Sequence, residues 1–194
     1  MVGLAVFNII LTSAFGTWLG IQDALIAAEK KTLTVTEAKK DALERYLHDI
    51  EVDLLVTANS GFTKEAVKDF DVSWDMIEGN PTQYLQNAYL PDGLDAAKRI
   101  EVTKATDGSI YSEYHAQYHP FFKDMLEKRG YYDIFLFDTK GNLLYTVFKE
   151  LDYATNMYSG QWKDTDLANA YKSAIKGQKE SVSFFDFRGY EPSY

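Results

Sequence analysis

The chain has 194 residues, of which 46% are hydrophobic and 15% aromatic, which is enough apolar surface for a sizeable packed core. Its formal net charge of −9 argues against a nucleic-acid partner, because phosphate binding depends on clustered Lys and Arg. It has no cysteine, which excludes disulfides, thiolate metal sites and cysteine nucleophiles.

Residues 1–22 contain no charged side chain, and the first charge of the chain is Asp23. A stretch of this length is enough to cross the hydrocarbon core of a bilayer, which is about 30 Å thick. We therefore predict a transmembrane helix at residues 1–22 that contacts the lipid bilayer through residues 2–22. A cleaved signal peptide and a buried core helix are the alternatives. No Lys or Arg precedes the apolar run, so the positive-inside rule does not orient it.

Residues 23–58 have the pattern of a long amphipathic helix that leaves the membrane. A β-branched run at 32–36 marks a weak point, where Thr34 and Glu37 have the spacing of a capping box. Apolar residues recur at spacings of four and three, namely Leu43, Leu47, Ile50 and Leu54. Such a stripe suits parallel dimerisation, and packing within a helical bundle of one chain explains it equally well.

Three shorter helices are expected next, separated by Gly, Asn and Pro breaks. They cover residues 63–77, residues 82–90 and, after a polar link at 95–109, residues 110–128. The last of them places aromatic rings and imidazoles on one face. The residues of that face are Tyr111, His115, Tyr118, His119 and Phe122.

A β-hairpin at residues 131–150 is the strongest local signal in the sequence. Two apolar strands, at 134–137 and 143–148, flank a polar turn in which Gly141 and Asn142 tolerate positive φ. Because both strands are apolar on both faces, we expect one face on a core and the other against a helix or a ligand cavity. A helix at 164–176, with Asp164 and Thr165 as candidate N-caps and Gly177 as its stop, and a third strand at 181–187 should follow. This gives an α+β fold class with an antiparallel sheet flanked by helices.

Catalytic motifs are weak in this sequence. His115 and His119 have the i, i+4 spacing of a zincin helix, but Ala116 stands where the general base would be. Two half-buried histidines in an aromatic stripe are the simpler interpretation. The sequence contains no nucleophile elbow, phosphate-binding glycine loop or dinucleotide fingerprint. We therefore expect no enzyme activity, no metal and no cofactor.

A small-molecule site has better support, in and around the second strand of the hairpin. Aromatic bodies with polar heads gather there and could line a cavity; packing of the tyrosines on the sheet is the alternative. Asp186, on the predicted third strand, suggests a buried carboxylate that a ligand amine would pair. The predicted ligand-binding residues are Tyr118, His119, Tyr145, Lys149, Asp152, Tyr158, Trp162 and Asp186.

Several segments resemble the extracytoplasmic sensor region of bacterial methyl-accepting chemotaxis proteins, specifically those with a Cache-type, PAS-like module. The resemblance rests on YHPFF at 118–122, RGYYDIFLFDTKGN at 129–142, VFKELDYATN at 147–156 and SGQWKDTDLA at 159–168. It implies a homodimer in the bacterial inner membrane, with the sensor part in the periplasm. It also implies that the sensor binds a small molecule and passes a helix displacement across the membrane to control chemotaxis signalling.

By this resemblance, residues 23–109 form the long juxtamembrane helix with a helical region, and residues 110–194 form the Cache-like module. The closing strands of that module, a second membrane helix and the signalling hairpin are all expected beyond residue 194. The same sensor could instead serve a membrane histidine kinase or a diguanylate cyclase. A membrane-tethered metal-dependent hydrolase and a purely structural helical membrane protein are rival interpretations from different classes of protein.

Overall fold

The computed structural model describes residues 2–91, 95–185 and 188–193, with the backbone alone at residues 2–11, 14, 96 and 193. The chain divides into two compact units, Met1–Asp53 and Leu54–Tyr194. The described part is mostly helical and includes a two-stranded antiparallel sheet. At this level, the predicted combination of helices with a small antiparallel sheet is confirmed.

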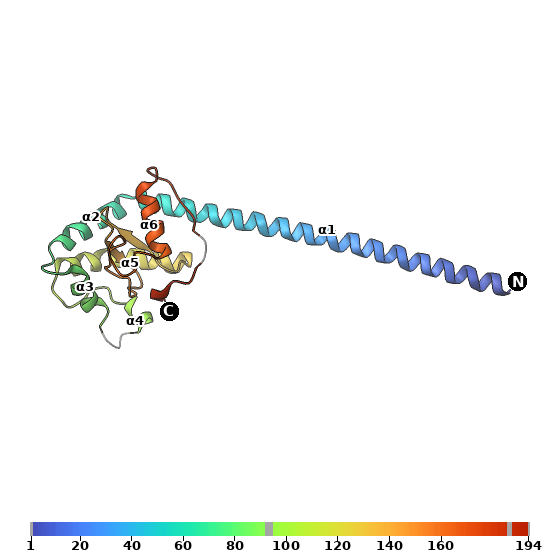
Figure 1. Cartoon of the computed structure of the whole chain (residues 1–194), viewed down its shortest axis with the longest axis horizontal. Helices are drawn as coiled ribbons and strands as arrows, with labels where there is room; N and C mark the ends of the chain where they lie inside the picture. Colours follow the sequence, from blue (N-terminus) through green and yellow to red (C-terminus); the bar gives the residue numbers. More distant parts are fainter. Residues whose placement is uncertain (1, 92–94, 186–187, 194) are drawn as a thin grey trace. The chain divides into compact units, whose positions relative to one another are not determined.

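The first helix, α1, runs without interruption from Val2 to Asn59 (Figure 1). The predicted weak point does not break it, because the hydroxyls of Thr32 and Thr34 donate to carbonyl oxygens one turn earlier, at 2.8 and 2.9 Å. This back-bonding lets Thr remain inside a helix, and the capping box is not used. All side chains from residue 15 to residue 46 are exposed.

Among the residues that the structure describes, no helix combines the length and the apolar character needed to cross a bilayer. The predicted membrane span at residues 1–22 falls in large part on side chains outside the described set, at residues 1–11 and 14. That span therefore stays a prediction.

The second and third helices begin at polar caps, as their sequences indicate. Helix α2, Gly61–Asp75, starts after Ser60, whose Oγ accepts a hydrogen bond from the Thr63 amide at 3.1 Å. Helix α3, Pro81–Tyr89, starts after Asn80, whose side chain caps it in the same way. These caps satisfy amide groups that have no partner inside the helix.

A short helix and a long one complete the region before the hairpin. The four-residue helix α4, Ala96–Arg99, lies inside the segment predicted as a polar link. Helix α5, Ile110–Arg129, is the predicted aromatic helix and ends at Gly130, which has a left-handed φ of 71°. The left-handed residue lets the Gly130 amide bond back to the last turn, which stops the helix there.

The hairpin is confirmed, with shorter strands than predicted: β1 spans Phe135–Phe137 and β2 spans Leu143–Thr146, paired antiparallel. The side chain of Asp138 holds the turn, because its Oδ1 accepts from the amides of Lys140 and Asn142 at 2.9 and 2.8 Å. Gly141 has a φ of 94° in that turn. Such an Asx turn sets the register of the two strands.

The hairpin contributes side chains to two clusters of buried residues. Leu144 and Tyr145 pack with buried residues of α2 and α5 in the main core. Leu143 packs with Ala168 and Tyr171 of α6 in a smaller cluster. Figure 1 shows the strands among α2, α5 and α6. Helices before and after the hairpin therefore pack against it, in agreement with the predicted antiparallel sheet flanked by helices.

Helix α6, Asp166–Lys176, begins after Thr165, whose hydroxyl accepts from the Ala168 amide. The predicted strand at 181–187 is wrong over its described part, because residues 181–185 form no strand. A strand exists only through its ladder of backbone bonds, and no described segment pairs with these residues. A short 3₁₀ turn, Glu191–Ser193, follows further on.

Candidate functional site

The space between β2 and α5 is filled by buried aromatic side chains whose polar atoms bond to one another. The hydroxyl of Tyr111 donates to the Leu144 carbonyl at 2.6 Å, and the hydroxyl of Tyr153 donates to Tyr111 at 2.9 Å. Tyr145 bonds to His119 at 2.7 Å. All of these side chains are buried, so this region is a packed core with satisfied hydroxyls.

The geometry fixes the tautomer of His119. Its Nε2 lies 2.7 Å from the carbonyl oxygen of Ile100, which can only accept, so Nε2 bears the hydrogen. Burial lowers the pKa of His119 to about 4, and the nearby charge of Lys149 acts in the same direction. The imidazole is therefore neutral, and its Nδ1 accepts the hydrogen of Tyr145.

His115 stacks on His119, with ring centroids 4.6 Å apart. Its Nδ1 lies 2.5 Å from the carbonyl oxygen of Thr103, and burial holds its pKa well below the usual range. Its Nε2 is buried and has no partner within the described part of the chain. No group of three or more His, Asp or Glu side chains that could hold a metal ion occurs among the described residues.

Lys149 is completely buried, which the sequence did not indicate. Its Nζ donates to the carbonyl oxygens of Arg99 and Val147 at 3.2 and 3.0 Å, and it lies 5.9 Å from the centre of the Tyr89 ring. Burial lowers the pKa of Lys149 to about 7. Its backbone has a positive φ of 53°, a conformation that is costly for a residue with a side chain.

Two carboxylates, the partly buried Asp133 and the buried Asp152, lie on either side of this segment in the sequence. Asp133 accepts hydrogen bonds from the hydroxyl of Thr146 and from the Val147 amide, and burial raises its pKa to about 7. Asp152 accepts from the Tyr190 hydroxyl at 2.6 Å through Oδ2, while its Oδ1 has no partner among the described residues. Burial raises the pKa of Asp152 to about 6.

The remaining predicted residues are scattered. Tyr118 is buried and donates to Asp69 on α2 at 2.5 Å. Tyr158 is 48% exposed and packs edge-on against Tyr171. Asp186 lies outside the described residues, so its predicted role in pairing a ligand amine stays a prediction.

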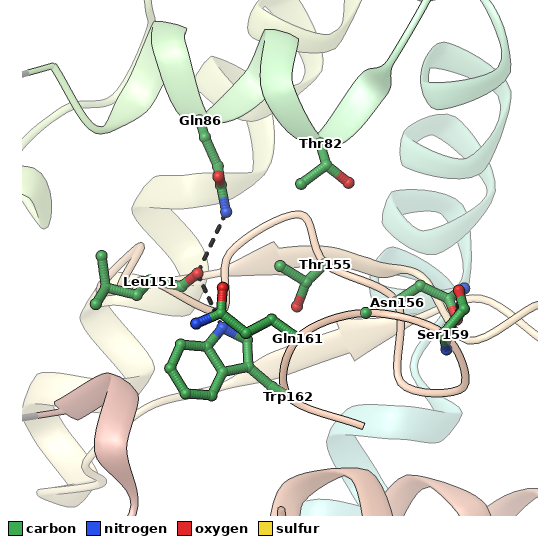
Figure 2. Close-up of a pocket in the computed structure, with 9 residues that line it drawn as sticks. Thr82, Gln86, Leu151, Thr155, Asn156, Ser159, Gln161 and Trp162 are labelled. Carbon is green, nitrogen blue, oxygen red and sulfur yellow. Dashed lines mark hydrogen bonds between the residues drawn. The ribbon is translucent and has the colours of Figure 1, made fainter. Parts of the chain in front are cut away.

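An open pocket of about 400 Å³ lies between α3 and the segment that follows the hairpin (Figure 2). At its base, the Gln86 amide and the Trp162 indole N–H both donate to the Leu151 carbonyl, at 3.2 Å each. The volume is within the range of small-molecule sites. The pocket is lined by Thr82, Gln86, Leu151, Thr155, Asn156, Ser159, Gly160, Gln161 and Trp162.

Of the predicted ligand-binding residues, Trp162 lines this pocket, while His119 and Tyr145 meet in the core. Sequence reasoning singled out the loop after the hairpin, and with it Asn156, but it gave no weight to Thr155 and Gln161. It also missed Thr82 and Gln86 on α3. Nothing in the sequence links that helix to a loop about 65 residues later, because only the folded packing brings them together.

Comparisons with known proteins add no relative, since no family model, curated protein or solved structure matches this chain.

Proposed function

We propose that this chain is the ligand-sensing part of a membrane chemoreceptor with a Cache-like, PAS-like sensor module. The observation that carries the proposal is the open pocket between α3 and residues 151–162. Its volume is within the range of small-molecule sites, and its lining combines uncharged polar groups with the apolar surfaces of Leu151 and Trp162.

A chain of contacts connects the pocket to the long helix. Tyr89, at the end of α3, packs on His115 of α5 with ring centroids 4.7 Å apart. On the same helix, the sulfur of Met125 accepts from the hydroxyl of Thr57, in the last turn of α1, at 3.6 Å. A ligand that tightens α3 against the hairpin therefore favours one packing of α5 and, through it, one position of the end of α1.

The size of such a response is limited by thermodynamics. A ligand shifts the balance between two packings only by the difference in its affinity for them. Binding that is equal in both packings gives no signal, however tight it is. The proposal therefore requires that the pocket differ between the two packings.

The membrane part of the proposal rests on the uncharged run at 1–22 and on the resemblance to chemoreceptors. It places the chain as a homodimer in the inner membrane of a bacterium, with the sensor part outside the cytoplasm. The stripe that includes Leu43 and Leu54, which are 57% and 50% exposed, is the proposed dimer contact.

Thermal unfolding of the full chain in detergent, with a broad library of amino acids, carboxylates, amines and sugars, tests the ligand-binding part. A true ligand raises Tm saturably, and at a hundredfold excess over Kd it adds about 2.7 kcal/mol of stability. The Ser159→Trp variant fills the pocket and should lose the shift. Ser183→Trp makes the same change at another exposed serine and should keep it. A library without any saturable ligand, or a shift that survives Ser159→Trp, contradicts the proposal.

A further inference from the structure

The lining of the pocket contains no charged side chain. It presents the hydroxyls of Thr82, Thr155 and Ser159, the carboxamides of Gln86, Asn156 and Gln161, and the apolar surfaces of Leu151 and Trp162. An ionised ligand group would therefore enter a site that offers no countercharge. Burying an unpaired charge is costly, so the composition already favours a neutral ligand.

The hydroxyl groups of the lining already donate their hydrogens to acceptors within the protein. Thr82 donates to the carbonyl oxygen of Ala154 at 2.5 Å, and Thr155 donates to that of Asp152 at 2.6 Å. Ser159 donates to the Asn156 side chain at 3.2 Å. A hydroxyl that has donated its one hydrogen keeps lone pairs, so toward the pocket these groups act as acceptors.

Most N–H groups of the lining side chains also donate to acceptors within the protein. The two amide hydrogens of Gln86 go to the carbonyl oxygens of Leu151 and Tyr153, at 3.2 and 2.7 Å. The amide nitrogen of Asn156 donates to two oxygens of the hairpin turn, and the indole of Trp162 donates to Leu151. Gln161 is exposed and makes no side-chain hydrogen bond within the described part of the chain.

The lining therefore offers acceptors in excess: Oε1 of Gln86 and the hydroxyl oxygens of Thr82, Thr155 and Ser159. A matching ligand must supply several hydrogen-bond donors and bear no charge. Polyhydroxyl compounds have this chemistry, and their C–H faces suit the apolar surfaces of Leu151 and Trp162. A carboxylate or phosphate lacks donors, and the net charge of −9 also repels it.

We infer that the pocket selects an uncharged polyhydroxyl ligand, of the sugar or sugar-alcohol class, and rejects anions. The inference rests on the proposed function and names the ligand class of the same site. An alkylammonium ligand satisfies the acceptors but finds no carboxylate in the lining to balance its charge.

Three probes with the same carbon chain and different end groups test this inference by isothermal titration of the full chain. They are sorbitol, gluconate and 1-amino-1-deoxysorbitol, which end in a hydroxymethyl group, a carboxylate and an ammonium. Sorbitol should bind saturably, with a Kd at least about tenfold below that of either charged analogue. The Ser159→Trp variant should abolish its binding.

A substitution that changes the charge preference of the pocket gives a second test of the inference. Gln161→Lys replaces an uncharged carboxamide of the lining with a cation, and it should improve gluconate binding by about tenfold relative to sorbitol. Gln178→Lys makes the same change of charge at an exposed glutamine outside the lining, and it should leave the preference unchanged.

The outcomes separate the two proposals. If gluconate or the ammonium analogue binds as tightly as sorbitol at a site that Ser159→Trp blocks, the ligand class is wrong and the sensing site stands. If Gln161→Lys and Gln178→Lys act alike, the lining does not set the charge preference, and the inference fails. If neither the three probes nor the wider library gives binding that Ser159→Trp removes, both proposals fail.

Discussion

The hydroxyl of Tyr145 donates to Nδ1 of His119 across 2.7 Å, and it joins the second strand of the hairpin to α5 in the middle of the core. The other ring nitrogen of His119 is held by the Ile100 carbonyl. A neutral imidazole in this position has both nitrogens satisfied, as buried polar groups require.

Removing that hydroxyl should destabilise the fold. Tyr145→Phe leaves the buried Nδ1 lone pair without a donor, and we expect it to cost about 1–3 kcal/mol of unfolding free energy in urea titrations. Tyr46→Phe, at a tyrosine that is 56% exposed, is the control and should change the unfolding free energy by less than about 0.5 kcal/mol. Equal effects of the two substitutions would mean that the bond to His119 contributes nothing to stability.

Lys149 predicts a dependence of stability on pH. Its pKa is about 7 in the folded chain, whereas an unfolded lysine keeps its proton up to about pH 10.4. Between these values the unfolded state binds the extra proton, so the contribution of Lys149 to stability rises with pH. Below pH 7, Lys149 is buried in its charged form, and this lowers the free energy of unfolding by its full amount. Lys149→Met removes this cost.

Lys149→Met should therefore be more stable than the wild type at pH 6, by on the order of 3 kcal/mol, and this advantage should shrink toward pH 10. Asp133 also titrates near pH 7, and comparing each variant with the wild type at the same pH removes most of its effect. Lys68→Met, at an exposed lysine, should stay within about 0.5 kcal/mol of the wild type at each pH. If the difference in unfolding free energy between Lys149→Met and the wild type did not change with pH, the titration assigned to Lys149 would be contradicted.

Substitution of two glycines with positive φ allows the stability cost of backbone strain to be measured apart from the cost of a steric clash. Gly130 has a φ of 71° and open space where a Cβ would stand, so Gly130→Ala should cost about 1–2 kcal/mol from strain alone. Gly141 has a φ of 94°, and a Cβ there would lie 2.7 Å from the Tyr158 ring. Gly141→Ala should therefore cost more than Gly130→Ala.

The excess cost of Gly141→Ala should disappear in a Tyr158→Ala background, which a double-mutant cycle in urea measures directly. Additive effects of the two changes would show that Tyr158 moves aside freely, and the clash would then have no energetic role.

The absence of cysteine makes the proposed dimer easy to examine. If the stripe on α1 forms a parallel pair, Ile50→Cys meets its own copy within the reach of a disulfide, about 7 Å between Cα atoms. Mild oxidation of membranes should then give a covalent dimer on a non-reducing gel. Asp49→Cys, one position away and off the stripe, should cross-link several-fold less. Similar yields at both positions would argue against a parallel dimer with this stripe at its centre.

Local chemistry explains which elements were predictable. Gly141 and Asn142 between apolar runs predicted the hairpin, and the break at Asn80 and Pro81 predicted the start of α3 to within one residue. The third strand at 181–187 failed because its aromatic composition favours a strand only where a partner strand is present, and composition does not reveal the partner.

The site was harder to predict, for a physical reason. Trp162 was found because aromatic side chains with polar heads gather in and after the second strand of the hairpin. Lys149 was predicted to bind a ligand, and its burial depends on a carbonyl of Arg99 that is 50 residues away along the chain. Gln86 has no local signal at all, because its place in the pocket lining exists only once α3 packs beside the loop.

The exposed helix α1 also has a consequence for hydrogen exchange. Over residues 15–46 its side chains are exposed, so its amide bonds depend mainly on helix propensity and should open on a fast timescale. Whatever covers this stretch, whether another copy of the chain or a bilayer, will slow deuterium uptake at the amides it protects. The exchange pattern along α1 would thus map the covering surface residue by residue.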